Sequence, residues 1–188
     1  MAFSFKRLEI PDVVAVESDI FKDERGFLTE TFKRSEFAKN NIATDFVQDN
    51  FVRSAKGVLR GLHYQLPPHT QGKLVRVTRG KALDVAVDLR RDSPWFGRWV
   101  GAELTADNGC ALWVPPGFAH GFIALEDDTD VYYKMTGGEY SLESARIIIW
   151  NDPTLNIDWK IKDPLLLPKD LAAPRFDKDG AYFEYNAS

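Results

Sequence analysis

Residues 82–89 have the sequence ALDVAVDL, and their side chains alternate between two kinds along the whole stretch. The odd-numbered positions are leucine or valine, and the even-numbered positions are alanine or aspartate. Because successive side chains of a β-strand point to opposite faces, this alternation predicts a strand with one apolar face and one small, acidic face. The acidic face allows two interpretations. It is the solvent face of a two-sheet sandwich, or it lines a polar cavity inside a barrel.

The segments on either side of this strand extend the same pattern. Val75 and Val77 alternate before it, and Arg79-Gly80-Lys81 forms a turn between the two runs. Further strands are predicted, separated by proline and glycine, at residues 97–104, 110–114, 121–125, 131–136 and 146–150. This spacing is typical of an all-β barrel or sandwich.

Only one short helix is predicted, a turn over residues 35–39 with Ser35 as its N-cap. Prolines 153, 164, 168 and 174 indicate mostly irregular structure towards the C-terminus. The chain has no internal repeat, low-complexity tract or linker, so we expect residues 1–188 to form a single domain.

Composition limits the classes of function. The 188 residues are 44% hydrophobic and 28% charged, which excludes a disordered chain and a disulfide-rich miniprotein. A net charge of -4 gives no general attraction to nucleic acid or to an anionic membrane, so an anionic ligand needs a local basic site. The first 18 residues contain no long apolar run, and Cys110 is the only cysteine. A cytoplasmic protein without a membrane span is therefore expected.

The three histidines are the candidates for acid–base chemistry. His69 lies in a polar, proline-rich loop, whereas His63 and His120 each follow a glycine within a strand-like run. Residues 115–120 contain Pro-x-Gly-x-x-His, which is the second sequence motif of cupin barrels. Metal-binding cupins have a second histidine where this chain has Gln65, and no glutamate occurs between residues 37 and 102. The remaining ligand set is poor, so no metal site is expected.

Ten segments, in order, resemble one family closely. They are residues 21–30, 46–50, 58–65, 71–76, 84–88, 93–97, 116–122, 133–134, 150–152 and 169–170. The family comprises the nucleotide-sugar 3,5-epimerases that act on dTDP-4-dehydro-6-deoxy-D-glucose and make dTDP-4-dehydro-L-rhamnose in dTDP-L-rhamnose biosynthesis. The resemblance implies a cupin-type jelly-roll barrel (a double-stranded β-helix) with short peripheral helices. It also implies a homodimer that needs no metal or organic cofactor. An exposed early strand offers a route to dimerisation by pairing with a partner's sheet edge.

Epimerisation next to a ketone requires a base, an acid on the opposite face and a positive group near the enolate oxygen. The resemblance implies that His63 is the base, oriented by Asp170. It makes Tyr133 the proton donor and Lys73 the cation. An imidazole of pKa ~6.5 is mostly neutral at pH 7, and a phenol of pKa ~10 keeps its proton. Strand alternation lets only one of Tyr132 and Tyr133 face the cavity, and the Tyr-Lys match favours Tyr133.

The resemblance also implies a set of substrate-binding residues. Arg25 and Arg60 match the phosphate-side cations, which suits the bidentate contacts of guanidinium groups with phosphate oxygens. Tyr140 is placed to stack on the nucleotide base. The remaining members of the set are Glu30, Gln48, Asn50, His120 and Lys169. A glutamate is expected five residues after Tyr140, where this chain has Ala145, and Glu143 is the candidate to replace it.

Three alternatives stay open. The first is a single-site epimerase that inverts only C3 or C5, because the motifs barely separate the two activities. The second is a metal-dependent cupin enzyme. The third is a sugar-nucleotide-binding module without catalysis, although the base, acid and cation are all present.

Overall fold

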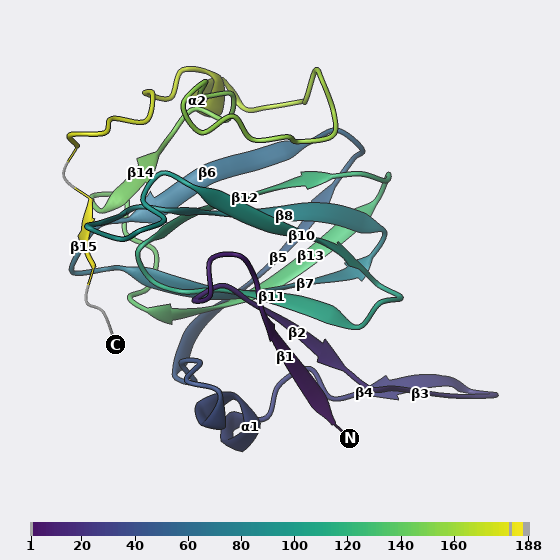
Figure 1. Ribbon diagram of the computed structural model, residues 1–188. Helices are drawn as coiled ribbons and strands as arrows, with labels where there is room; N and C mark the ends of the chain where they lie inside the picture. The colour runs from purple at the N-terminus through teal and green to yellow at the C-terminus, as the bar shows by residue number, and fades with distance from the viewer. Residues whose placement is uncertain (1, 181, 186–188) are drawn as a thin grey trace.

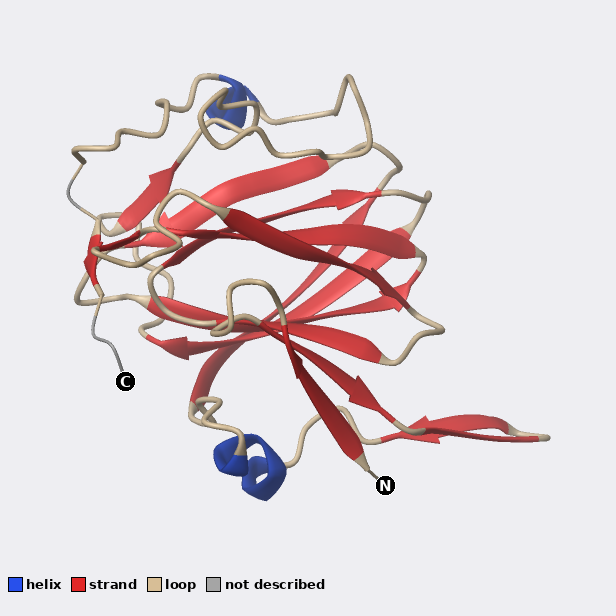
Figure 2. Ribbon diagram, in the orientation of Figure 1, coloured by secondary structure: helices blue, strands red, loops and turns tan. Residues whose placement is uncertain are grey.

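The computed structural model describes residues 2–180 and 182–185, and it places most strands in two facing antiparallel sheets (Figures 1 and 2). The six-stranded sheet contains, in spatial order, β1 (Phe3–Arg7), β2 (Val14–Ser18), β11 (Cys110–Val114), β7 (Gln71–Arg79), β13 (Thr129–Gly137) and β5 (Phe46–Ser54). The five-stranded sheet contains β10 (Trp99–Thr105), β8 (Lys81–Asp88), β12 (Phe118–Ala124), β6 (Leu59–Gln65) and β14 (Ala145–Ile147). This arrangement confirms the predicted all-β jelly-roll barrel.

Two smaller strand pairs and two short helices lie outside the barrel. The hairpin of β3 (Ile20–Asp23) and β4 (Gly26–Thr29) projects from one end of the molecule, where Figure 1 shows it as a free arm. Near the C-terminus, β15 (Phe183–Glu184) pairs in parallel with β9 (Arg90–Arg91). Helix α1 (Arg34–Lys39) lies below the six-stranded sheet, and α2 (Pro168–Leu171) lies above the five-stranded sheet. The helices are therefore peripheral, as expected.

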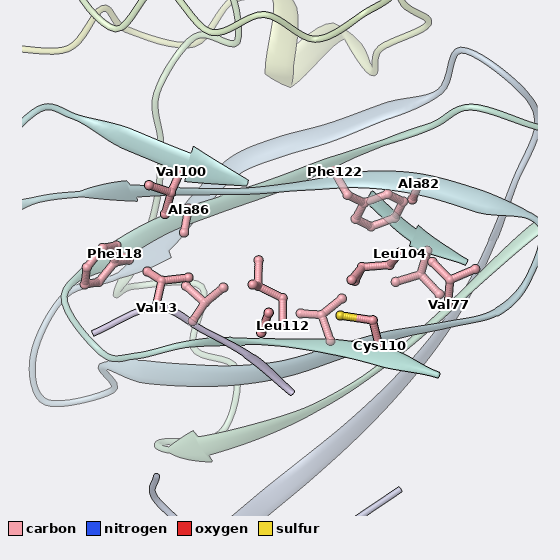
Figure 3. Packing of buried hydrophobic residues seen from close by; sticks show 14 of the residues in the cluster. Val13, Val77, Ala82, Ala86, Val100, Leu104, Cys110, Leu112, Phe118 and Phe122 are labelled. Carbon is pink, nitrogen blue, oxygen red and sulfur yellow. The ribbon is translucent and has the colours of Figure 1, made fainter. Parts of the chain in front are cut away.

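Strand β8 is buried on both faces, and this decides between the two interpretations of its acidic face. Leu83 and Val85 pack in a cluster with Trp159 and Phe176 of the C-terminal segment, which covers the outer face of the five-stranded sheet. The even-numbered residues turn inward, where Ala82 and Ala86 join the core between the sheets (Figure 3). The small, acidic face of β8 thus faces the barrel interior rather than solvent.

Several local predictions need correction. Helix α1 begins at Arg34, with Lys33 at the N-cap position and no side-chain cap, so Ser35 does not cap it. The strand expected at residues 146–150 is only the short β14. The C-terminal segment is mostly irregular, as expected, but Pro168 begins α2 because proline lacks only a backbone donor that the first helical turn leaves unpaired. No helix within the described residues is long and apolar enough to cross a membrane.

Candidate active site

Two adjoining cavities open between the sheets, and four side chains line both of them. The inner cavity, of about 160 Å³, also contacts Arg60, His120 and Asp170. The outer cavity, of about 270 Å³, also contacts Gln48, Asn50 and Tyr140. The four shared residues are His63, Lys73, Tyr133 and Lys169. The structure therefore brings ten of the thirteen predicted site residues to one connected space.

His63 lies on β6 and forms a close pair with a buried carboxylate. Its Nε2 atom is 2.9 Å from Oδ1 of Asp170, which α2 presents above this strand with its side chain only 2% exposed. Burial lowers the pKa of His63 below its ordinary value, and the hydrogen bond to Asp170 offsets part of this effect. Lys73 and Lys169 lower the pKa further. The imidazole is thus oriented and held neutral, as a general base requires.

Tyr133 lies on β13 of the opposite sheet, so the cavity separates it from the wall that carries His63. Nδ2 of Asn50 donates a hydrogen bond to the Tyr133 hydroxyl at 3.1 Å. Tyr132 faces the other way and donates to Asp49 at 2.7 Å. The prediction that Tyr133, and not Tyr132, faces the cavity is confirmed. This arrangement places a phenolic proton opposite the imidazole base.

Lys73 lies on β7 and contacts both cavities. Burial lowers the pKa of its ammonium group to about 8, and the charge of Asp84 acts in the opposite direction. The group is therefore a cation at neutral pH in a poorly solvated site. A positive charge in such a place can stabilise an enolate oxygen far more strongly than it would in water.

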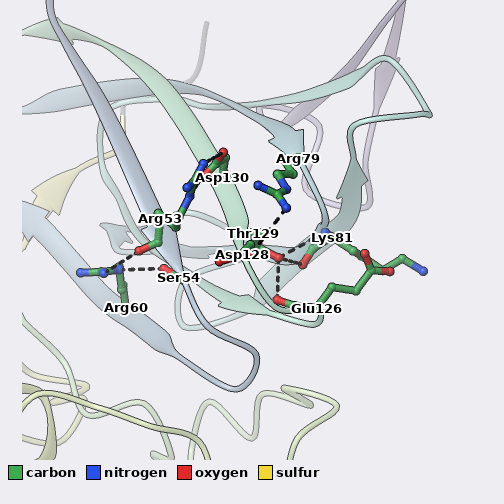
Figure 4. Close-up of polar contacts among 9 residues, drawn as sticks. All are labelled: Arg53, Ser54, Arg60, Arg79, Lys81, Glu126, Asp128, Thr129 and Asp130. Carbon is green, nitrogen blue, oxygen red and sulfur yellow. Dashed lines mark hydrogen bonds and ion pairs between the residues drawn. The ribbon is translucent and has the colours of Figure 1, made fainter.

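Arg60 lies at the rim of the inner cavity, where neighbouring groups fix its guanidinium. Its Nε donates to the Ser54 hydroxyl at 3.2 Å, and its Nη2 lies 3.5 Å from the Arg53 carbonyl oxygen (Figure 4). Arg53 in turn makes two 2.7 Å hydrogen bonds to Asp130. Since Arg53 is already paired, Arg60 is the guanidinium available to a ligand at this rim.

The outer cavity has a polar wall made by β5 and the loop after β13. Gln48 donates to Asn50 at 3.1 Å and accepts a 2.9 Å hydrogen bond from the Tyr140 backbone nitrogen. Gln48 and Asn50 lie two residues apart on one strand and share a face, as predicted, and both line the outer cavity. The Tyr140 side chain is 58% exposed at the mouth. Such an aromatic ring offers a surface on which a planar group can stack.

Three predicted residues do not line either cavity. Arg25 lies at the tip of the β3–β4 hairpin, paired with Asp23 at 2.6 Å. Glu30 directly follows β4, and its Oε2 atom is buried without a hydrogen-bond partner among the described residues. Glu143 is exposed, and Ala145 lines the outer cavity instead. Within one chain, the proposal that Glu143 replaces the missing glutamate is not supported by its position.

The sequence interpretation missed Gln65 and Gln71, which line the outer cavity, and Asp84, which bonds His120 from behind the inner one. Strand alternation could have found the two glutamines, because Gln65 lies two residues after His63 and Gln71 two residues before Lys73. Gln65 is not free to bind a metal ion. Its amide group donates to the backbone of His69 and Glu139 and accepts from Ser141. Within residues 2–180 and 182–185, no three His, Cys, Asp or Glu side chains cluster as metal ligands.

Comparisons with known proteins agree on one family. Residues 7–178 match the family model for dTDP-4-dehydrorhamnose 3,5-epimerase. The chain is 49% identical over 178 residues to the Shigella flexneri protein of that name, covering 94% of this chain and 97% of the relative. It is 51% identical over 172 residues to the Pseudomonas aeruginosa protein, covering 90% and 94%.

A solved structure resembles the whole chain. The Legionella pneumophila dTDP-6-deoxy-D-glucose-3,5-epimerase, in complex with dTDP-4-keto-L-rhamnose, superimposes with a TM-score of 0.93 at 44% identity. The match covers 99% of this chain and 100% of that one. Because the family model matches residues 7–178 and relatives of about 50% identity match along nearly their whole length, the chain belongs to the dTDP-4-dehydrorhamnose 3,5-epimerase family.

Proposed function

We propose that the chain converts dTDP-4-dehydro-6-deoxy-D-glucose to dTDP-4-dehydro-L-rhamnose by inverting C3 and C5. The observation that carries this proposal is the opposition of His63 and Tyr133 across one cavity that Lys73 also lines. A base on one wall and an acid on the facing wall suit inversion, because the proton leaves one face of the carbon and returns to the other.

Each inversion needs two proton transfers and no change in oxidation state. Neutral His63 takes the proton from the carbon next to the C4 ketone, and the electron pair of the broken C–H bond moves to form an enolate. The Lys73 ammonium stabilises the negative oxygen. Tyr133 then donates its proton to the opposite face of the carbon as the ketone reforms. Exchange with solvent removes the proton from His63 and restores it to Tyr133.

The binding roles divide between the two cavities. We assign the sugar to the inner cavity, where His120 contributes a polar contact, and the diphosphate to the cations Arg60 and Lys169. The nucleotide extends into the outer cavity, where Gln48, Asn50 and Tyr140 are available to the base. Guanidinium and ammonium groups at the junction supply the local positive charge that the acidic chain as a whole lacks. The cytoplasmic location remains a prediction.

The test of the proposed reaction is a coupled assay. Purified chain, dTDP-4-dehydro-6-deoxy-D-glucose, NADPH and a dTDP-4-dehydro-L-rhamnose reductase are mixed, and NADPH consumption is followed. We expect consumption that is proportional to the amount of the chain added. Absence of consumption, with the reductase shown to be active on authentic product, would contradict the proposal.

We further propose a homodimer in which the β3–β4 arm covers a second copy. Phe21, Phe27 and Leu28 are 48%, 64% and 60% exposed on this arm. Strand β5 is a free edge of the six-stranded sheet and carries the exposed side chains Val47 and Phe51. Apolar surface and an open strand edge favour association with another chain. Contact of the arm with the partner's cavity would also give Arg25 and Glu30 the substrate roles that the resemblance implies.

Light scattering after size-exclusion chromatography tests the dimer. The wild-type chain is expected to elute with twice the mass of one chain, and Phe27→Asp is expected to shift this mass towards that of a monomer. Leu142→Asp, at an 80% exposed position outside the arm, is the matched control and should stay dimeric. A monomeric wild type would refute the proposed dimer.

The pH dependence of kcat/KM follows from two shifted groups. His63 must be neutral to accept a proton, and its lowered pKa places the acid limb of the profile below 6.5. Lys73 must be charged, and its pKa of about 8 places the alkaline limb near that pH. In Lys73→Arg the alkaline limb should move upward, because a guanidinium keeps its proton. An alkaline limb at the same pH in both proteins would exclude Lys73 as its source.

A further inference from the structure

Asp84 is a buried carboxylate behind His120, next to the inner cavity, and none of the assigned roles uses it. It lies on the inward face of β8 and is completely inaccessible to solvent. Its Oδ1 atom is 2.8 Å from Nε2 of His120, a residue whose side chain is only 7% exposed. Its Oδ2 atom has no hydrogen-bond partner among the residues that the structure describes. Burying a carboxylate oxygen without a partner is costly, so its presence calls for an explanation.

Besides the hydrogen bond to His120, Asp84 acts electrostatically on Lys73, which faces a cavity with few negative charges. The titratable and charged groups around it are Asp84 on β8, His120 on β12, Tyr133 on β13, His63 and Arg60 on β6, and Lys169 and Asp170 on α2. Asp170 is bonded to His63. Asp84 is the carboxylate that acts on Lys73 to favour its charged form, and within the described residues the two make no direct ion pair.

We propose that Asp84 is a positioning residue of this active site: its Oδ1 fixes the His120 ring in the wall of the inner cavity, and its buried negative charge complements the cations of that cavity. His63 and His120 are cross-strand partners on β6 and β12, so the cavity wall carries two histidine–aspartate pairs side by side. The first pair, with Asp170, prepares the base. The second, with Asp84, positions His120 in the wall of the cavity where the enolate oxygen becomes negative. The inference rests on the proposed epimerase reaction only for its kinetic test.

The first experiment needs no turnover. Only three histidines are present, so ¹⁵N NMR of imidazole-labelled protein gives a simple spectrum, and His120→Asn assigns the third ring. We expect Nε2 of His120 to carry a proton at pH 7, donated to the Asp84 carboxylate, and we expect Asp84→Asn to change the His120 ¹⁵N shifts. An unprotonated Nε2 would overturn the proposal, whether or not the chain is an epimerase.

The second experiment is the kcat/KM profile of Asp84→Asn, a substitution that keeps the shape of the side chain and removes its charge. The alkaline limb should move down by about one pH unit, since loss of a nearby opposite charge makes an ammonium easier to deprotonate. In the Lys73→Arg background the same substitution should not move this limb. An alkaline limb at the wild-type pH in folded Asp84→Asn would overturn the proposal.

A matched control separates this role from a merely structural one. Asp88 is also completely buried on the inward face of β8, but it bonds Arg90 and Ser93 instead of a histidine that lines the cavity. Asp88→Asn should lower the melting temperature and leave the alkaline limb in place. If Asp88→Asn moves the limb as far as Asp84→Asn does, the effect belongs to any buried charge on β8, and the proposal fails.

Discussion

His63→Ala is expected to abolish deuterium wash-in at both C3 and C5 and to lower turnover by about 10²- to 10⁴-fold, the usual contribution of a positioned general base. The reason is geometric. The imidazole of His63 lines the inner cavity from β6, and its Nε2 atom is held by Asp170. Incubation of substrate in deuterated buffer, followed by proton NMR, measures the loss of each carbon-bound proton directly. Retention of wash-in at either carbon would show that another group abstracts that proton.

Asp170→Asn is the companion variant, because it removes the orienting charge and leaves His63 in place. Loss of a carboxylate partner lowers the proton affinity of the imidazole, so exchange at both carbons should slow without disappearing. If Asp170→Asn loses as much exchange as His63→Ala does, the carboxylate is more than an orienting group. Melting curves of both variants should be compared first, since Asp170 is buried and α2 packs close to β6.

Tyr133→Phe is expected to separate exchange from inversion. The base remains, so His63 still removes and returns protons on its own face, and some deuterium should enter the substrate. The donor on the opposite face is gone, so most inversion should be lost. Loss of a general acid of this kind typically lowers the rate by about 10²- to 10⁴-fold. NMR reports both quantities in one sample, since deuterium content and sugar configuration are read from the same spectrum.

Tyr132→Phe is the matched control for this experiment. The same hydroxyl is removed from the same strand, but from the side that bonds Asp49 rather than the cavity. It should leave both exchange and inversion near the wild-type rate. If Tyr133→Phe and His63→Ala lose exchange equally, base and donor do not have separate roles.

Those parts of the site that follow from strand alternation could be predicted from the sequence. A period of two predicted the shared face of Gln48 and Asn50 and showed that only one of Tyr132 and Tyr133 can face the cavity. For residues 82–89 it predicted the strand and its two faces, while the direction of the acidic face stayed open. The chemistry assigned to His63 and Lys73 came from the family resemblance, and the structure shows that the two share a cavity. These assignments succeed because the local sequence pattern agrees with the fold that the whole chain adopts.

The remaining parts depend on contacts that no local pattern contains. Arg25 lies on an arm that leaves the barrel, so its distance from the cavity is decided by the path of the β3–β4 hairpin. Glu143 shares its loop with residues at the outer cavity, yet its own side chain is not among those lining it. The Asp84–His120 pair joins the neighbouring strands β8 and β12, although the two residues are 36 positions apart in the sequence. Such pairings appear only when the sheet is assembled.

The central claim, inversion at two carbons by one base–acid pair, is tested most directly by proton NMR of the product formed in deuterated buffer. The wild-type chain, with dTDP-4-dehydro-6-deoxy-D-glucose and a coupled reductase to trap the product, is expected to yield an L-configured sugar with deuterium at both C3 and C5. A product with deuterium and inverted configuration at only one of these carbons would contradict the account and identify a single-site epimerase.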